Sequence, residues 1–436
     1  MSHIIIKSIP FTTHVKQGAK HLLAHDKARA QKLVQGLHPH GPLGHKAVAA
    51  GRHRHHHHRK PHEDPAPTPT PTEPTEPTEP APVPPAGDPE AAKNSIDVTD
   101  AGVTYTMSVG VGSPATQYTL LIDTGSSNTW VGANKAYKQT STSKSTRNTV
   151  NVTYGSGSFS GTEFTDEVTL GSLAIKNQSI GVASKATGFD DVDGILGFGE
   201  LAGTVSNTPN VPTVTQNLFT QKLIPTESIG ISYEPTTSEG VLNGELTFGT
   251  TDTSKTTSDV TFVPITSTSP ASNYWGIDQS LSYGQDSSPI LTSSGIVDTG
   301  TTLLLIATDA FQAYQQATGA TLDQTTGLLT VTDEQFSNMQ SLFFKIGSTT
   351  LEFTPNAQIW PRSQNSTLGG EEGKIYLITS DLGNNSGTGL DFIISDWYIL
   401  SALDGFAFLQ RFYSVYDTTN AQVGFATTPF TDAETN

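Results

Sequence analysis

The segments LLIDTGSSNTW (residues 120–130) and SGIVDTGTTLLLI (residues 294–306) determine the architecture of this chain. In each of them a run of apolar residues leads into Asp-Thr-Gly. A single Asp-Thr-Gly is most simply a strand that runs into a tight turn, where Asp and Gly are favoured. Two copies in matched apolar settings need another explanation. They indicate two related lobes that arose by duplication, with Asp123 and Asp298 at equivalent positions.

The composition of the chain excludes several kinds of chemistry. The 436 residues include no Cys, so disulfides, thiolate nucleophiles and Cys-ligated metals are excluded. All 13 His lie between His3 and His62. Chemistry in the large C-terminal part therefore cannot use a Ser-His-Asp triad or most zinc-hydrolase sites.

Charge is distributed unevenly along the chain. Residues 1–62 hold 11 Lys and Arg but only one acid, Asp26, whereas residues 101–436 hold 12 Lys and Arg against 31 Asp and Glu. Such an acidic body repels nucleic acid and anionic membranes, so we expect neither as a partner. It attracts the basic N-terminal segment of the same chain.

The N-terminal segment has three distinct parts. Residues 15–37 have an amphipathic helical pattern. Residues 53–60 read HRHHHHRK, which is interpreted either as a solvated tail that titrates with pH or as a metal-binding tract. Residues 65–85 read PAPTPTPTEPTEPTEPAPVPP, an extended linker that cannot pack a core and marks a domain boundary.

From about residue 95 the sequence is typical of a mostly β protein. Short alternating runs rich in Val, Thr, Tyr and Phe occupy residues 103–112, 151–161, 244–249 and 411–417, with Gly, Ser, Asn and Asp between them. Residues 308–319 are the best helix candidate. A body of about 340 residues exceeds the usual size of one core, so we expect two lobes.

Two carboxylates at an interface between duplicated lobes can perform catalysis without His, Cys or metal. When two such groups lie a few ångströms apart, one pKa falls and the other rises, and the pair shares one proton. One member then serves as general base and the other as general acid, which is enough to activate a water molecule. The sequence therefore predicts no cofactor and no metal at this site.

Four motifs together resemble the pepsin-like aspartic endopeptidases, and most closely the secreted fungal enzymes of the polyporopepsin type. They are DTGSSNTWVG (123–132), VDTGTTL (297–303), VTYGSGSFSG (152–161) and DGILGFG (193–199). The resemblance implies a mostly β, bilobal fold, with the active-site cleft between two related β-lobes and a basic propeptide in front. The implied domains are a propeptide over 1–94, an N-terminal lobe over 95–229 and a C-terminal lobe over 230–436.

The same resemblance assigns roles to residues in the two Asp-Thr-Gly loops. Asp123 and Asp298 would be the catalytic pair: one deprotonates the attacking water, and the other polarises the scissile carbonyl and then protonates the amine. Neighbouring hydroxyl and backbone N–H groups would hold the two carboxylates. These supporting residues are Gly125, Ser126, Gly300 and Thr301.

The motif at 152–161 resembles the hairpin that closes over substrate, called the flap here. Tyr154 would be the flap tyrosine, with its hydroxyl bonded to the indole N–H of Trp130, and Gly155 and Ser156 would offer hydrogen bonds to the substrate backbone. Taken singly, Tyr154 and Trp130 are more simply a cross-strand aromatic and a core residue. The presence of both Asp-Thr-Gly loops favours the flap assignment.

The resemblance also implies the biology of the enzyme. We expect an endopeptidase that hydrolyses proteins and peptides at acidic pH and is made as a zymogen inhibited by its own propeptide. We expect a monomer, because one chain supplies both Asp-Thr-Gly loops. Secretion is expected although the apolar run in MSHIIIKSIPF is too short for a signal peptide. Four Asn-x-Ser/Thr sequons, at Asn151, Asn177, Asn365 and Asn384, are compatible with secretion.

Charge predicts how the propeptide would leave. Near neutral pH, opposite charges hold the basic segment on the acidic body. Acid protonates the body carboxylates and charges the His of the segment, so the attraction weakens and self-repulsion grows. Self-cleavage in or after the Pro-rich linker would then give a mature chain that begins near Asn94 and Ser95.

One stretch departs from the family pattern. Residues 390–417 read LDFIISDWYILSALDGFAFLQRFYSVYD, and removing residues 394–403 restores the fungal pattern. An apolar insertion near the active site should be costly by overpacking. The alternative reading is therefore a catalytically silent, pepsin-fold binding protein, and a metal-binding His-rich cell-wall protein is a third reading.

Overall fold

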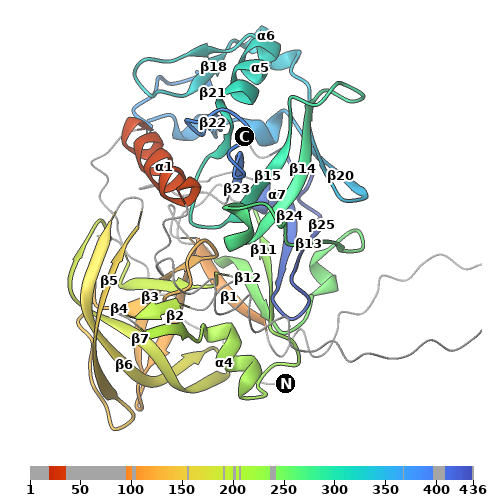
Figure 1. Ribbon diagram of the computed structural model, residues 1–436. Helices are drawn as coiled ribbons and strands as arrows, with labels where there is room; N and C mark the ends of the chain where they lie inside the picture. Colours follow the sequence, from red (N-terminus) through yellow and green to blue (C-terminus); the bar gives the residue numbers. More distant parts are fainter. Residues whose placement is uncertain are drawn as a thin grey trace, which may run out of the picture.

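The computed structural model describes residues 19–35, 95–100, 105–154, 157–189, 192–199, 203–205, 208–235, 242–366, 368–395 and 408–434. Among these residues strands outnumber helices, and they form two bodies joined through a shared sheet (Figure 1). The mostly β, bilobal fold expected from the sequence is confirmed.

The largest sheet has thirteen strands and extends from the N-terminal lobe into the middle of the molecule. Its strands, in spatial order, are β13 (Thr261–Pro264), β25 (Gln422–Thr427), β24 (Phe412–Asp417), β11 (Ser228–Tyr233), β12 (Leu242–Phe248), β1 (Ser95–Asp100), β2 (Tyr105–Val111), β3 (Thr116–Asp123), β8 (Gly194–Gly197), β4 (Trp130–Val131), β7 (Leu173–Thr187), β6 (Ser158–Leu170) and β5 (Lys144–Thr153).

The C-terminal lobe is built on a seven-stranded sheet, and two smaller sheets complete the fold. The seven strands are, in order, β20 (Thr349–Phe353), β19 (Leu342–Ile346), β14 (Gly276–Tyr283), β15 (Leu291–Asp298), β23 (Phe392–Ser395), β16 (Leu304–Ile306) and β22 (Thr379–Asp381). The smaller sheets are β9 (Gly203–Val205) with β10 (Thr208–Val211), and β17 (Thr321–Leu322), β18 (Leu329–Val331) and β21 (Ile375–Tyr376).

The two lobes repeat one topology around the Asp-Thr-Gly loops. In the N-terminal lobe β3 lies antiparallel to β2 and parallel to β8, and β8 lies antiparallel to β4. In the C-terminal lobe β15 lies antiparallel to β14 and parallel to β23, and β23 lies antiparallel to β16. Asp123 pairs with Gly197 across the first parallel pair, and Asp298 pairs with Ser395 across the second. Each aspartate thus ends a central, buried strand.

The described residues form few helices. They are α1 (Ala19–Val34), α4 (Val214–Thr220), α5 (Thr308–Thr318), α6 (Asp333–Ser337) and α7 (Phe408–Arg411), with 3₁₀ turns at Thr253–Lys255, Ala271–Asn273, Asn356–Gln358 and Arg362–Gln364. The helices predicted at 15–37 and 308–319 are confirmed as α1 and α5. Gly319 caps the C-terminal end of α5, and its φ of 68° lies in the left-handed region that glycine adopts readily.

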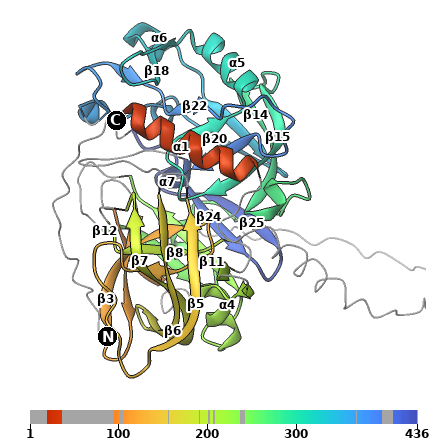
Figure 2. The ribbon, with the colours of Figure 1, turned by 60° about the vertical axis from the view of Figure 1, so that its left-hand side comes forward.

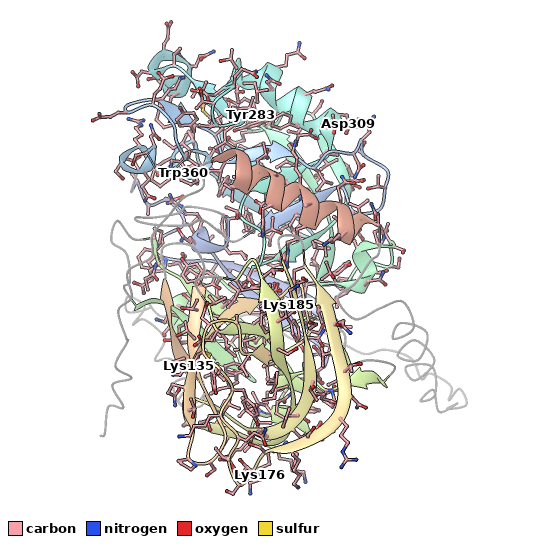
Figure 3. All side chains as sticks on the ribbon, turned by 90° about the vertical axis from the view of Figure 1, so that its left-hand side faces the viewer. Lys135, Lys176, Lys185, Tyr283, Asp309 and Trp360 are labelled. Carbon is pink, nitrogen blue, oxygen red and sulfur yellow. The ribbon has the colours of Figure 1, made fainter. Side chains whose placement is uncertain are left out.

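Helix α1 lies between the two lobes (Figures 2 and 3). Leu22, Ala30 and Leu33 are buried in the main core, and Leu23 and Val34 pack against it. This apolar stripe explains why the segment is helical in this setting, since most helical stability in proteins comes from packing of an amphipathic face.

The expected boundary between the lobes and the expected insertion can both be located in the strands. The expected lobe boundary between residues 229 and 230 falls within β11, which pairs with β12 and β24 in the shared sheet. Of the expected insertion 394–403, the first two residues continue β23, and residues 396–403 lie outside the described residues. Among the described helices, none combines the length and apolar character that crossing a membrane requires.

Candidate active site

The first Asp-Thr-Gly loop holds Asp123 at the end of β3. The Asp123 side chain is fully buried. The Gly125 N–H donates to Asp123 Oδ1 at 3.0 Å, and the Ser126 hydroxyl donates to Asp123 Oδ2. Both contacts favour an ionised carboxylate.

The second loop holds Asp298 in the same way. Asp298 is also fully buried. The Gly300 N–H donates to Asp298 Oδ1 at 2.9 Å, and the Thr301 hydroxyl donates to Asp298 Oδ2 at 2.6 Å. The matched position of the two hydroxyls, three residues after each aspartate, is therefore accompanied by a common hydrogen-bonding role.

The central threonines of the loops join the two lobes. The Thr124 N–H donates to the Thr299 hydroxyl oxygen at 2.9 Å, and the Thr299 N–H donates to the Thr124 hydroxyl oxygen at 3.0 Å. The Thr299 hydroxyl in turn donates to the Ile122 carbonyl at 3.1 Å, and that of Thr124 donates to the Val297 carbonyl at 3.4 Å. This reciprocal set fixes one loop against the other.

Glycine is required in both loops because each backbone approaches the aspartate of the other lobe. A Cβ at Gly125 would lie 2.3 Å from Asp298 Oδ1, and one at Gly300 would lie 2.6 Å from Asp123 Oδ1. Such contacts are far inside van der Waals distance. The glycines therefore let the two carboxylates approach each other, in addition to letting each turn close tightly.

A side chain from α1 contacts both aspartates. Arg29 Nη2 lies 2.8 Å from Asp123 Oδ1 and 2.9 Å from Asp298 Oδ1, and Arg29 Nε lies 2.8 Å from Asp298 Oδ2. Arg29 Nη2 therefore bridges Asp123 Oδ1 and Asp298 Oδ1, which are the inner oxygens of the two carboxylates. The guanidinium group is almost completely buried, and its charge is balanced by the pair.

The environments of the two aspartates push their pKa values in opposite directions. Burial raises the pKa of Asp123; Arg29 opposes this and the charge of Asp298 adds to it, and the net pKa is raised. Burial also acts to raise the pKa of Asp298, but the charge and hydrogen bonds of Arg29, with the Thr301 hydroxyl, outweigh it, and the net pKa is lowered. In this state Asp298 is the better anion and Asp123 accepts a proton more readily.

A second group on α1 anchors the helix beside the loop. Asp26 is fully buried, and its Oδ2 accepts hydrogen bonds from the Thr302 N–H at 3.2 Å and the Leu303 N–H at 2.9 Å. His25 Nδ1 lies 3.0 Å from Asp26 Oδ1. The only acid in the sequence of residues 1–62 is therefore bonded to the backbone that follows the second Asp-Thr-Gly loop.

Further contacts link α1 to the flap and to the C-terminal lobe. Lys32 Nζ donates to the Tyr154 carbonyl. Lys27 Nζ lies 3.4 Å from Asp381 Oδ2, and Gln31 Nε2 donates to the Leu382 carbonyl at 3.4 Å. The helix thus contacts the first loop, the flap hairpin and the second lobe at once.

The flap residues lie on an aromatic cluster. Trp130 is buried and stacks on Phe159, with ring centroids 4.2 Å apart, and Tyr154 lies 6.4 Å from Trp130. The hydrogen bond expected between the Tyr154 hydroxyl and the Trp130 indole N–H is not formed, because within the described residues neither Tyr154 Oη nor Trp130 Nε1 has a hydrogen-bond partner. Burial raises the Tyr154 pKa, and the nearby indole N–H only partly opposes this. Gly155 and Ser156 lie outside the described residues.

Sequence reasoning identified the aspartates and their loops but missed Arg29 and Asp26. A signal was present, because both charged residues lie within the apolar stripe of α1 rather than on its polar side. Positions 22, 26, 29, 30 and 33 share one helical face. A charge within such a stripe indicates a buried partner of opposite sign or a set of hydrogen-bond donors.

The described residues hold no group of three or more His, Asp or Glu side chains arranged to bind a metal ion. The His-rich tract at 53–60 lies outside the described residues, so its interpretation remains a sequence hypothesis. The aspartate pair itself is occupied by a cation from the protein, the guanidinium group of Arg29.

Comparisons with known proteins agree with this geometry. The family model described as "Eukaryotic aspartyl protease" matches residues 104–428. The chain is 59% identical over 350 residues to polyporopepsin of Irpex lacteus, an alignment that covers 79% of this chain and 100% of that protein. It is 31% identical to gastricsin of Homo sapiens, covering 74% of this chain and 81% of gastricsin.

A solved structure shows the same similarity. The crystal structure of the aspartic proteinase from Irpex lacteus superposes with a TM-score of 0.74 at 59% sequence identity, covering 78% of this chain and 99% of that one. The two buried aspartates, the paired loops and the two β-lobes are thus found in a chain whose similarity to aspartic proteases extends over most of its length. The chain belongs to the eukaryotic aspartyl protease family and is a pepsin-like aspartic endopeptidase.

Proposed function

We propose that this protein cleaves peptide bonds at acidic pH by activating water between Asp123 and Asp298, and that it is made as a zymogen in which α1 blocks that pair. The observation that carries the proposal is the position of Arg29 Nη2, within 2.9 Å of an inner oxygen of each aspartate. A site that holds one nitrogen between two carboxylates has the dimensions to hold one water molecule in its place.

In the proposed reaction, the ionised aspartate takes a proton from the water as that water attacks the scissile carbonyl carbon. The protonated aspartate donates a hydrogen bond to the carbonyl oxygen and then supplies the proton to the leaving amine. Gly125, Ser126, Gly300 and Thr301 hold the carboxylates in place through the hydrogen bonds described above. Tyr154, Gly155 and Ser156 would cover the substrate from the flap, with Trp130 beneath.

The zymogen proposal rests on three contacts that α1 makes at once. Arg29 neutralises the pair, Asp26 occupies backbone donors beside the second loop, and Lys32 bonds the flap at Tyr154. Substrate cannot enter while the helix fills this position. Residues 1–94 therefore act as an inhibitory propeptide, and secretion follows from the similarity to secreted fungal enzymes.

The catalytic part is tested with Asp123→Asn and Asp298→Asn. Each variant is processed in trans by immobilised wild-type enzyme, so that failure to self-activate does not hide residual activity, and haemoglobin digestion is followed at about pH 3, where the pair shares a proton. We expect a loss of roughly 10³-fold or more for each. Asp286→Asn is the matched control, because Asp286 is exposed and has a φ of 59°, which Asn tolerates. Wild-type activity in either dyad variant would refute the mechanism.

The zymogen part is tested with Arg29→Ala against Lys27→Ala on the same helix. Both remove one positive charge, but only Arg29 touches the aspartates, whereas Lys27 forms a half-exposed ion pair. After a drop in pH we expect the wild type and Lys27→Ala to show a lag before cleavage begins, and Arg29→Ala to show almost none. An equal lag in all three chains would exclude Arg29 as the inhibitory contact.

A further inference from the structure

Four sequons occur in the sequence, and the structure places their Asn side chains in different environments. Asn151 and Asn177 are exposed, Asn365 is 1% exposed, and Asn384 is half-buried. N-glycosylation joins the sugar to Nδ2, so the accessibility of that atom in the folded protein decides whether a glycan is compatible with the fold. We propose that Asn151 and Asn177 are the N-glycosylation sites of this protein and that Asn365 and Asn384 remain unmodified.

Asn151 lies on the outer side of the flap hairpin. In β5 the side chains alternate, with Val150 at 2% and Val152 at 3% exposure in the aromatic cluster and Asn151 and Thr153 exposed on the other face. Both recognition residues of the sequon, the Asn and the Thr two positions later, therefore face outward. A glycan here would leave the packing of the strand unchanged.

Its position along the strand places this glycan near the active site. Asn151 pairs with Ser160, which pairs in turn with Lys185 in β7. Lys185 lies at the end of the N-terminal lobe that faces α1 (Figure 3). Tyr154 follows three residues later on the same hairpin, so a glycan on Asn151 would stand on the back of the flap.

Asn177 lies at the opposite end of the lobe. It falls in an irregularity of the β6–β7 pairing and has a φ of 52°. Lys176, the residue before it, lies at the end of the lobe farthest from α1 (Figure 3). Asn is one of the few residues that adopt this left-handed conformation readily, so backbone geometry alone also explains an Asn here, and the experiment must separate the two roles.

Asn365 is held by bonds that a glycan would break. Its Nδ2 donates to the Glu371 carbonyl at 2.7 Å and to the Lys374 carbonyl at 2.7 Å, so both amide hydrogens are used. Attachment of a sugar replaces one of these hydrogens and needs space that a buried side chain lacks. A chain glycosylated at Asn365 before folding could not form this turn.

Asn384 resembles Asn365 in that the amide nitrogen to which a sugar would be attached is buried. Its Nδ2 is buried although the residue as a whole is half-buried. Its backbone carbonyl accepts a hydrogen bond from the Thr308 N–H at 2.8 Å, which ties the loop to the start of α5. A glycan would require this side chain to rotate out of its packed position.

The proposed modification is an ordinary group transfer. A lipid-diphosphate oligosaccharide is the donor: the bond from Nδ2 to sugar C1 forms, the bond from C1 to the diphosphate oxygen breaks, and the amide nitrogen loses one proton. The lipid diphosphate is the leaving group. This inference rests on the secretion proposed above, since the transfer occurs on chains that enter the secretory pathway.

The test is site mapping on the full chain secreted from yeast behind a heterologous leader, which supplies secretion independently of the natural routing. Peptide-N-glycosidase converts each glycosylated Asn to Asp, and peptide masses then identify the sites. We expect conversion at 151 and 177 only. Occupancy at 365 or 384 in the secreted protein, or an unmodified 151 or 177, would overturn the proposal.

Sequon variants count the glycans independently. Asn151→Gln and Asn177→Gly should each remove one glycan, and glycine keeps the backbone conformation at 177. Thr367→Ala removes the third sequon without changing Asn365 itself, and Asn384→Gln removes the fourth. Thr367→Ala and Asn384→Gln should not change the mass of the glycosylated protein beyond the substitution itself. Loss of a glycan in either of the last two would contradict the assignment.

Discussion

The two lobes are alike where they meet the aspartates and differ one strand behind them. Each contributes a central strand, a paired Asp-Thr-Gly loop and a parallel strand that passes behind the aspartate. In the first lobe the residue opposite Asp123 is Gly197, and in the second the residue opposite Asp298 is Ser395. The two lobes are therefore alike in the loops that carry the aspartates. They differ in the parallel strand behind each aspartate, β8 or β23, which is called the supporting strand here.

The supporting strand of the first lobe is tightly fitted. A Cβ at Gly197 would lie 2.7 Å from the backbone nitrogen of Asn128. The next residues close the loop, because the Phe198 N–H donates to the Asp123 carbonyl at 2.7 Å and the Gly199 N–H donates to the Ser126 carbonyl at 2.7 Å. In the second lobe the residues directly after Ser395 lie outside the described part of the chain.

The largest effect is expected for Gly197→Ala. The new methyl group meets backbone atoms that cannot move aside, so we expect a loss of about 3 kcal/mol in the free energy of unfolding. The matched change in the other lobe, Ser395→Gly, should alter stability by less than about 1 kcal/mol. Urea unfolding of both variants measures the difference. Equal costs would show that the two supporting strands are not distinguished by backbone fit.

The next effect concerns the bonds between the lobes. Thr124→Val and Thr299→Val each remove a hydroxyl that both donates and accepts inside the interlobe contact, so each should cost about 2 kcal/mol. Because the two hydroxyls act in one reciprocal set, the double variant should cost less than the sum of the single variants. Thermal unfolding of the single and double variants measures this, and strict additivity would argue against a shared network.

A smaller effect is expected from deleting residues 394–403. The deletion brings Asp404 and Gly405 directly after Ile393, so that a glycine stands opposite Asp298 as Gly197 stands opposite Asp123. We expect the shortened chain to be more stable by about 1 kcal/mol, as relief of overpacking would give, and to digest haemoglobin at least as fast as the full chain. If the full chain is active and the shortened one is not, Ile394 and Ser395 are the working supporting strand.

The smallest effect is a shift in the pH at which α1 is released. Asp298 has a lowered pKa, so its pairing with Arg29 stabilises the zymogen above the ordinary carboxyl range and is lost as pH falls through the lowered value. Asp123 has a raised pKa and is protonated at a higher pH, which weakens the other half of the contact first. Thr301→Ala removes a bond that lowers the Asp298 pKa, so release should move to higher pH.

Both chains carry Asp123→Asn, so that neither can cleave itself, and the chain with Asp123→Asn alone is the reference for Thr301→Ala. Release is followed during an acid titration by the fluorescence of a dye attached to the propeptide. Thr142→Ala is a control, because its hydroxyl bonds Asp166 in the N-terminal lobe and not the pair. A shift to lower pH with Thr301→Ala would contradict the expected direction.

Much of this molecule was predictable from local sequence patterns. Helix α1 and helix α5 follow from apolar spacing, and the strands follow from alternating β-branched and aromatic residues. The positions of Asp123 and Asp298 follow from the two apolar runs that carry Asp-Thr-Gly. These features depend on residues close together in the chain, which is why a sequence can reveal them.

The partners of those residues needed the folded chain. The sequence showed a basic segment and an acidic body, but it did not show that Arg29 reaches both aspartates across 94 and 269 positions of chain. Likewise four sequons read alike, although one has its amide hydrogens fully used by two carbonyls. Contacts between distant residues are set by how strands and helices pack, and packing depends on the whole chain at once. Local patterns were therefore enough to identify the reacting groups and the class of fold, whereas the groups that touch them became visible only once the two lobes and α1 had packed together.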